Sequence, residues 1–486
     1  MERPLKVLIC SAEARPYAKT GGLADVAGSL PKALAALGHD ARLALPKYRS
    51  VYEGGFDTTP LYSGFMIPVG SKRQRVSVEV SHAGGVPTYL VVSDRRFRRP
   101  AGLYGYPDDA ERFIFFCRAV LGMIERDGWR PDLIHCNDWQ TGLVPVYLQT
   151  AYPGLADIAS LYTVHNLAYQ GNSPPETLAL AGLPPQLFNC HQLEFFGQLS
   201  LMKAGLLFAD AISTVSPTYA REITEPEYGE GLDGVLRERR DRLYGILNGI
   251  DYDFWNPQTD PHLAANYSLE SAPLKKVRNK DALQRALALE RRPLPVLAIV
   301  SRLTSQKGLD LVEQALPDLM AHQLQFVVLG TGDPHYQLLL QEAAARYQGR
   351  MAVTIGFDEP LAHRIYAGAD LFLMPSRYEP CGLGQMISMR YGTIPVVRRT
   401  GGLADTVQPF QPAAGTGNGF LFDGYRAADL TAAVTAALDT YRDTTLWQAL
   451  MRNAMLTDFS WERSAAGYLD LYRTSLQLHR AGAPGG

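Results

Sequence analysis

Short runs rich in Val, Ile and Leu alternate with longer helical patterns along most of this chain, and this alternation restricts the fold more than any other feature. It occurs in two series, one in each half of the sequence. Strand–helix alternation predicts parallel sheets with helices on both faces. We therefore expect an α/β protein with two doubly wound domains. The predicted strands are 6–10, 41–45, 88–92, 133–135, 160–164 and 211–215, then 296–300, 325–329, 353–355, 371–374 and 394–397.

Apolar spacing of three and four residues predicts helices over 23–37, 309–321 and 336–347. A glycine-spaced segment at 244–251 separates the two series. The expected domains are 1–244 and 245–458, followed by a tail at 459–486 of one or two amphipathic helices. We expect this tail to pack back on the first domain.

The charge balance excludes a global attraction to nucleic acid or to an anionic membrane. Lys and Arg total 47 against 49 Asp and Glu, so the formal net charge is −2, and any anion site must be local. Five scattered cysteines without a C-x-x-C pair argue against a disulfide framework and against structural zinc. No apolar run approaches the ~20 residues of a membrane span. We expect a cytoplasmic protein without nucleic-acid or membrane partners.

The hexapeptide TGGLAD occurs twice, at 20–25 and at 400–405, and both copies precede a predicted helix in a loop after a strand. Ligands of doubly wound sheets bind beyond the carboxyl ends of the strands. Paired glycines allow the backbone to approach a ligand closely, and free amides at a helix start favour an anion. Lys19 adds a positive charge to the first copy. A plain tight turn is the alternative, and the repeat itself is open to common ancestry or coincidence.

Two loops of the second series carry chemistry. Arg302 and Lys307 follow strand 296–300, and two cations at this spacing suit a diphosphate, although an ordinary solvated loop is the alternative. Glu379 follows strand 371–374 and can bind sugar hydroxyls, while the amides of 381–383 can bind phosphate. Cys381 fits a small packing residue better than a nucleophile, because no Cys–His pairing is visible.

Two neighbouring strands of the first series end in polar residues. Asp138 and Trp139 follow one, and His165 and Asn166 follow the next, so these side chains should meet at one sheet edge. A structural and a catalytic histidine are equally compatible with this pattern. No G-x-G-x-x-G follows the first strand and no Walker A loop occurs, which disfavours dinucleotide binding. The D-x-D at 251–253 falls between the domains and suggests a structural role rather than a metal site.

Seven segments in this order resemble bacterial glycogen synthases and plant starch synthases, over nearly the whole chain: KTGGLADV, HCNDWQTGL, TVHNLAYQG, ILNGID, SRLTSQKG, PSRYEPCGLGQ and VVRRTGGLADTV. The resemblance implies a GT-B fold, with two Rossmann-like domains facing a deep cleft. It implies transfer of glucose from ADP-glucose to the non-reducing end of an α-1,4-glucan such as glycogen. Configuration would be retained, ADP released, and no metal or other cofactor used. The alternatives are another retaining GT-B transferase with a different nucleotide sugar or acceptor, and a non-catalytic sugar-binding protein.

The resemblance also implies residue roles. Arg302 and Lys307 would stabilise the departing diphosphate, Glu379 would bind glucose hydroxyls, and Asp138 and His165 would line the sugar site; these five form the expected catalytic set. The expected donor-binding set is Lys19, Gly21, Gly22, Asp25, Asn248, Phe357, Cys381, Gly382, Leu383, Thr400 and Gly401. Phe357 stands where the family often has a tyrosine, so it keeps a face for stacking on adenine but lacks the hydroxyl. Related retaining transferases carry a second glutamate eight positions after the first, and this position is Ile387 here.

Overall fold

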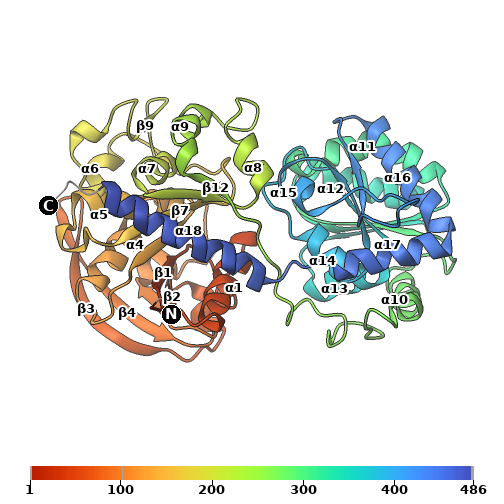
Figure 1. Ribbon diagram of the computed structural model, residues 1–486, viewed down its shortest axis with the longest axis horizontal. Helices are drawn as coiled ribbons and strands as arrows, with labels where there is room; N and C mark the ends of the chain where they lie inside the picture. Colours follow the sequence, from red (N-terminus) through yellow and green to blue (C-terminus); the bar gives the residue numbers. More distant parts are fainter. Residues whose placement is uncertain (1–2, 101, 483–486) are drawn as a thin grey trace. The chain divides into compact units, whose positions relative to one another are not determined.

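The computed structural model describes residues 3–100 and 102–482, so the last four residues of the expected tail lie outside it. The chain forms two compact units (Figure 1). One comprises residues up to Gly249 together with those from Trp461 onward, and the other is Ile250–Ser460. The expected boundaries, after residues 244 and 458, lie close to these. Each unit has its own largely parallel sheet covered by helices, which confirms the expected α/β class.

The first unit is built on a nine-stranded sheet in the order β12-β11-β7-β6-β1-β2-β5-β4-β3. The seven strands from β12 to β5 in this order are parallel to one another. Their bounds are β1 Lys6–Cys10, β2 Asp40–Pro46, β5 Thr88–Val92, β6 Leu133–Asn137, β7 Ala159–Val164, β11 Ala211–Thr214 and β12 Leu243–Gly245. The central strands are buried along their length, as expected for a sheet covered on both faces. All six strands predicted in this half are present.

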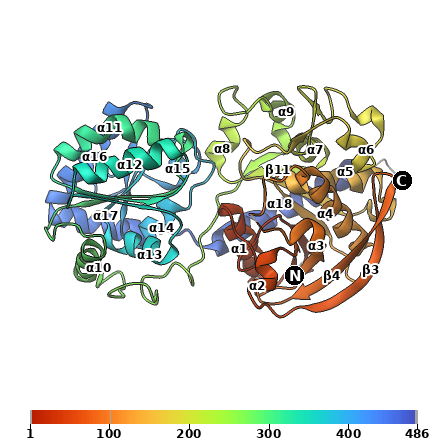
Figure 2. The same ribbon diagram turned by 180° about the vertical axis from the view of Figure 1, so that it is seen from behind.

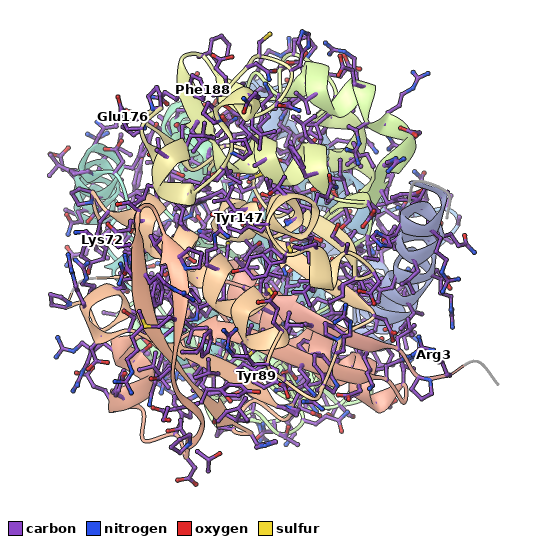
Figure 3. The ribbon with its side chains drawn as sticks, turned by 90° about the vertical axis from the view of Figure 1, so that its left-hand side faces the viewer. Arg3, Lys72, Tyr89, Tyr147, Glu176 and Phe188 are labelled. Carbon is purple, nitrogen blue, oxygen red and sulfur yellow. The ribbon has the colours of Figure 1, made fainter. Side chains whose placement is uncertain are left out.

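The edge of this sheet was not predicted. β3 (Thr59–Val69) and β4 (Lys72–Ser81) form an antiparallel hairpin that pairs with β5 through β4, so the sheet is mixed rather than parallel. The extra residues at two register shifts lie in β3 and interrupt its alternation, whereas β4 alternates regularly at Val76, Val78 and Val80 and was overlooked. Figure 3 shows the hairpin, with Lys72 labelled at its turn, where β4 begins. A small second sheet, in the order β8-β10-β9, has strands too short to be detected: β8 Asn172–Ser173, β9 Glu194–Phe195 and β10 Gln198–Ser200.

Helices cover both faces of the first sheet. α1 (Gly22–Ala36) and α18 (Trp461–Gly482) pack on one face, and α18 crosses the front of the sheet in Figure 1 and lies behind it in Figure 2. The Tyr472 hydroxyl on α18 lies 2.9 Å from His135 Nδ1 on β6, so the terminal helix belongs to this unit. The other helices of the unit are α2 Arg49–Glu53, α3 Asp94–Phe97, α4 Asp109–Ile124, α5 Leu143–Thr150, α6 Thr177–Ala181, α7 Leu201–Phe208, α8 Pro217–Glu222 and α9 Asp233–Glu238. Tyr147 of α5, labelled in Figure 3, is fully buried among them.

The second unit has a six-stranded parallel sheet in the order β15-β14-β13-β16-β17-β18. The strands are β13 Val296–Val300, β14 Gln325–Gly330, β15 Met351–Ile355, β16 Leu371–Met374, β17 Ile394–Arg398 and β18 Phe420–Phe422; only β18 was not predicted. The helices are α10 Ala272–Ala286, α11 Leu309–Ala321, α12 Pro334–Arg346, α13 Glu359–Gly368, α14 Gly384–Arg390, α15 Gly401–Thr406, α16 Ala427–Arg442 and α17 Thr444–Leu456. Within the described part of the chain, no helix has the length and apolarity needed to cross a membrane.

Candidate active site

The first TGGLAD copy follows β1, and a buried glutamate organises it. Glu13 Oε2 accepts hydrogen bonds from the backbone N–H of Gly21, at 3.0 Å, and of Thr20. Burial raises the pKa of Glu13, and these two amides oppose the rise. A carboxylate therefore occupies two amides at the position where the sequence predicted free donors for an anion. Both amides precede α1, so anion binding by the amides at the start of this helix stays a prediction. Sequence reasoning missed Glu13 although it lies just beyond a strand end.

Lys19 of the same loop belongs to a cluster of two cations and one carboxylate. Lys19 Nζ lies 2.9 Å from Asp25 Oδ1, and Arg15 Nε lies 3.2 Å from the same oxygen. Asp25 is in the first turn of α1 and is partly exposed, as are both cations. Asp25 balances one of these two positive charges, and buried Glu13 interacts electrostatically with both Lys19 and Asp25. Arg15 is a second residue that sequence reasoning missed.

The ends of β6 and β7 bring Asp138 and His165 together, as their places after neighbouring strands suggested. Asp138 Oδ1 accepts a 2.7 Å hydrogen bond from the His165 backbone N–H, and the Asp138 N–H donates to the Thr163 carbonyl. Asp138 has φ 54° and ψ −179°, a strained backbone conformation that is rare for any residue other than glycine and occurs preferentially at functional sites. Burial raises the pKa of Asp138 to about 7, although hydrogen bonds from the backbone amides of His165 and Asn166 act to lower it.

Asn137 fixes the tautomer of His165. The buried Asn137 Nδ2 donates to the carbonyls of Cys10, at 3.0 Å, and of His135, at 3.3 Å, so its Oδ1 is the acceptor for His165 Nε2 at 2.8 Å. Nε2 therefore carries the hydrogen. Burial lowers the pKa of His165 to about 3, so the ring is neutral near pH 7 and Nδ1 is a hydrogen-bond acceptor. Asn137 directly precedes Asp138, and this adjacency to a predicted site residue was the only sequence signal for it.

The raised pKa of Asp138 predicts a specific pH dependence of stability. The folded-state pKa of about 7 exceeds the usual 3.8, so the contribution of this group is fully present below pH 3.8 and is lost as pH rises through 7. We expect wild type to lose unfolding free energy relative to Asp138→Asn between pH 4.5 and 8. Asn is the matched variant because it tolerates positive φ and accepts the same hydrogen bond. Urea denaturation across this range tests the prediction, and a difference that does not vary with pH would contradict it.

In the second unit the structure brings Lys307 and Glu379 into contact. Lys307, at the end of the short turn Ser305–Lys307 before α11, places Nζ 2.5 Å from Glu379 Oε2. The Ser376 hydroxyl donates to the same oxygen at 3.0 Å. The Glu379 side chain is only 6 % exposed. This carboxylate is held in one position by a cation and a hydroxyl, and Ser376 is a further residue that sequence reasoning did not identify.

The second TGGLAD copy holds the Glu379 loop by close backbone packing. Gly401 has φ 43°, and a Cβ at this position would lie 1.9 Å from the Glu379 carbonyl oxygen. The Gly402 N–H donates to that same oxygen at 3.0 Å, and a Cβ at Gly402 would lie 2.1 Å from the Cys381 carbonyl oxygen. Both glycines are therefore required by sterics. The two copies of the hexapeptide differ: a carboxylate occupies the amides of the first, whereas the second is a packing surface for the Glu379 loop.

The remaining predicted residues lie in loops or beside them. Arg302 follows β13 and donates to Gln306 Oε1 at 2.9 Å, and Phe357 follows β15 with 81 % of its surface exposed. Gly382 has φ 73°, and Cys381 and Thr400 are buried. Asn248, near the end of the first unit's continuous segment, is also buried.

The D-x-D sequence at 251–253 forms a local turn. Asp251 Oδ1 accepts hydrogen bonds from the N–H groups of Asp253, at 3.0 Å, and Phe254, at 3.1 Å. These contacts agree with a structural role. Across residues 3–100 and 102–482, no group of three or more His, Cys, Asp or Glu side chains is arranged to hold a metal ion.

Comparisons with known proteins identify the family of this chain. The sequence model described as starch synthase catalytic domain matches residues 6–238, and that of glycosyl transferases group 1 matches 282–450. The chain is 50 % identical to a glycogen synthase of Moorella thermoacetica, covering 99 % of both chains. It is 49 % identical to a glycogen synthase of Desulforudis audaxviator, covering 98 % of this chain and 97 % of that one.

Solved structures give the same picture. The catalytic domain of starch synthase IV from Arabidopsis thaliana, bound to ADP and acarbose, has a TM-score of 0.92 and 35 % identity over 98 % of this chain and 100 % of that chain. A sucrose-phosphate synthase from Thermosynechococcus elongatus has a TM-score of 0.60 at 21 % identity, with the same coverage, and shares the fold alone. These neighbours confirm the GT-B architecture.

Proposed function

Since this chain belongs to the family of bacterial glycogen synthases and plant starch synthases, and is therefore a glycosyltransferase, we propose that it transfers glucose from ADP-glucose to an α-1,4-glucan. Glucose joins the non-reducing end with retained configuration, and ADP leaves. The observation that carries the proposal is the Lys307–Glu379 pair, held at 2.5 Å. In this proposal Lys307 is the cation that stabilises the leaving diphosphate, and Glu379, in contact with it, is the carboxylate that binds sugar hydroxyls.

The main requirement of the reaction is stabilisation of the negative charge that develops on the leaving ADP. Arg302 and Lys307 supply two cations from the second domain, and Lys19 and Arg15 supply two from the first. Fixed cations directed at developing negative charge lower a barrier most where water is excluded. Each domain therefore carries two cations that can neutralise phosphate charge, and the proposed reaction uses no metal ion. The backbone of 381–383, Thr400 and Gly401 completes the donor site in this proposal.

The transferred glucose meets acceptors and donors from both domains in this proposal. Glu379 accepts hydrogen bonds from sugar hydroxyls through the carboxylate oxygen that faces away from Lys307. His165 accepts one through Nδ1, because Asn137 keeps the hydrogen on Nε2. Asp138 and Asn248 supply further polar groups. None of these residues acts as a general acid through an imidazolium, since His165 is neutral near pH 7.

Retention without a covalent intermediate fits these residues best. A double displacement needs a free carboxylate nucleophile about 5 Å from a partner acid. Glu379 is instead engaged by Lys307 and Ser376, and Ile387 occupies the position of the second glutamate. We therefore propose attack on the same face that the diphosphate leaves, assisted by the leaving phosphate. A glucosyl adduct trapped on Glu379 or Asp138 would overturn this mechanism.

We propose that the adenine base of the donor stacks on the ring of Phe357. We expect Phe357→Ala to weaken ADP and ADP-glucose binding by ~1–2 kcal/mol, the scale of one base–aromatic stack. Phe357→Tyr is the matched control, because it keeps the ring and should retain the affinity. Isothermal titration of both ligands measures the effect. Unchanged affinity in Phe357→Ala would place the adenine elsewhere.

A donor competition assay tests the proposed function. Purified protein receives ADP-glucose or UDP-glucose with glycogen as primer, and release of the nucleoside diphosphate and incorporation of glucose are measured. We expect elongation that strongly prefers ADP-glucose. Elongation with UDP-glucose alone would favour the alternative of a different donor, and absence of turnover with either would favour a binding protein. We also propose a cytoplasmic location, where the described cysteines, all free, stay reduced.

A further inference from the structure

A strained hairpin beside the His165 loop exposes the ring of Phe196 to solvent, and the ring of Phe195 beside it is partly buried against the core. β9 and β10 are joined by Phe196 and Gly197, which have φ 47° and 77°. Two-residue turns with left-handed backbone at both positions favour Asn-Gly, because a bulky side chain is disfavoured there. Phe196 nevertheless occupies the first position, with 83 % of its surface exposed. Backbone strain of this kind is concentrated at functional sites, and here the strained residue is the one that carries the exposed ring.

The ring pair is held in place by its surroundings. The rings of Phe195 and Phe196 lie 4.7 Å apart at 79°, an edge-to-face arrangement. Phe195 and Phe196 both pack beside Gly231, where a Cβ would come within 3.1 Å of the Phe195 ring. At the base of the hairpin, buried Lys203 donates to the carbonyls of Cys190, at 2.6 Å, and Glu194, at 2.7 Å. The hairpin therefore presents its rings from a fixed support.

The same hairpin is built onto the loop that carries His165. β10 pairs with β8, which begins directly after that loop ends at Gly171. Gln170 connects the two: its carbonyl accepts from the Met202 N–H at 3.0 Å, and its Nε2 donates to the Glu230 carbonyl at 2.9 Å. Glu230 precedes the Gly231 that supports the rings. Figure 1 shows β9 beside α9 within the first unit.

We propose that the Phe195–Phe196 hairpin binds the α-glucan acceptor at glucose units away from the reacting end. This inference rests on the proposed function. Glucose units in an α-1,4-glucan expose apolar C–H faces, and the flat apolar faces of aromatic rings pack against such surfaces. The exposed amide of Gln198 adjoins the rings and can bind sugar hydroxyls. The connection to the His165 loop through Gln170 places this binding surface on the element that also holds the reacting sugar.

Other occupants fit the hairpin less well. A stable protein partner needs about 800 Å² of surface on each side, far more than two rings supply. An anionic membrane surface would require exposed Lys or Arg beside the rings. The segment 194–200 reads EFFGQLS and contains neither, and the nearby Lys203 is buried and donates to carbonyls. A short run of neutral sugar units matches both the size and the charge of this surface.

The test compares Phe196→Asn, which suits the turn and removes the ring, with Phe196→Trp, which keeps an aromatic face. Leu338→Asn on α12, where Leu338 is 59 % exposed, is the control for loss of an exposed apolar side chain. At saturating ADP-glucose, we expect Phe196→Asn to raise KM for glycogen about fivefold or more, the effect of losing one ring contact. KM for maltotriose and kcat should stay within about twofold of wild type. Phe196→Trp and Leu338→Asn should behave as wild type.

Retardation by glycogen in a native gel provides a readout that needs no turnover. We expect wild type and Phe196→Trp to be retarded and Phe196→Asn to be retarded less. Equal retardation of all three proteins, or equal KM values of wild type and Phe196→Asn for glycogen, would refute glucan binding by the Phe195–Phe196 hairpin. A wild-type protein that elongates no glucan from ADP-glucose refutes the proposed function instead, and gel retardation still distinguishes the Phe196 variants in that case.

Discussion

Replacing Lys307 by alanine is expected to lower kcat by ~10²-fold or more, the effect of losing one donor that stabilises transition-state charge. Two consequences combine in this variant. The leaving diphosphate loses a cation, and the buried Glu379 carboxylate loses its partner at 2.5 Å, so the sugar site is disturbed as well. ADP affinity should fall less than kcat, because the charge matters most as the bond breaks. Steady-state rates and ADP titration measure the two effects separately.

A double-mutant cycle with Glu379→Gln shows whether the pair works as one unit. Glu379→Gln keeps the shape of the side chain and removes the charge that Lys307 neutralises. Residues that act together have non-additive effects, so the double variant should be little worse than Lys307→Ala alone. Full additivity would mean that the two side chains act independently. Near-normal turnover of folded Lys307→Ala would remove Lys307 from the mechanism.

Most of the fold could be predicted because buried parallel strands leave continuous apolar runs. α11 was predicted with the bounds that the structure shows, Leu309–Ala321, since its apolar spacing and flanking residues are regular. β3 was not predictable because the extra residues at its register shifts interrupt the alternation, whereas β4 alternates at Val76, Val78 and Val80 and could have been predicted. β8 to β10 were not predictable because strands of two or three residues are too short to show a period. The type of a helix or strand was therefore predictable from its local residue pattern. Which strands pair with each other was predictable only where parallel strands are joined by crossover connections.

The site was less predictable, for a related reason. Strand ends indicated where Asp138, His165 and Glu379 lie, but contacts between distant residues leave no local pattern. Lys307 and Glu379 are 72 positions apart, and their contact is visible only in the folded chain. Glu13 was missed because a carboxylate beside a glycine loop gives no sign that it will accept the loop amides. The identical letters of the two TGGLAD copies were the most misleading signal, since the two copies have different partners.

Because the two copies have different surroundings, replacing a glycine by alanine should destabilise the protein strongly in the second copy and only slightly in the first. Gly401→Ala places a Cβ 1.9 Å from the Glu379 carbonyl oxygen at φ 43°, so the Glu379 loop must move. We expect a loss of about 3 kcal/mol or more in the stability of the second domain, and little remaining activity. Gly21→Ala is the matched control. Its φ is −143°, and the nearest atom to the new Cβ, Glu13 Oε1, is 3.7 Å away.

Gly21→Ala should therefore change the free energy of unfolding by no more than ~1 kcal/mol. Its activity then decides what the first copy does. A stable Gly21→Ala protein with a raised KM for ADP-glucose would show that this glycine keeps room for the donor. A stable protein with normal kinetics would show that Gly21 is not needed for donor binding and that the first copy is a turn ordered by Glu13. Comparable destabilisation by the two substitutions, measured by urea denaturation, would contradict the assignment of different roles to the two loops.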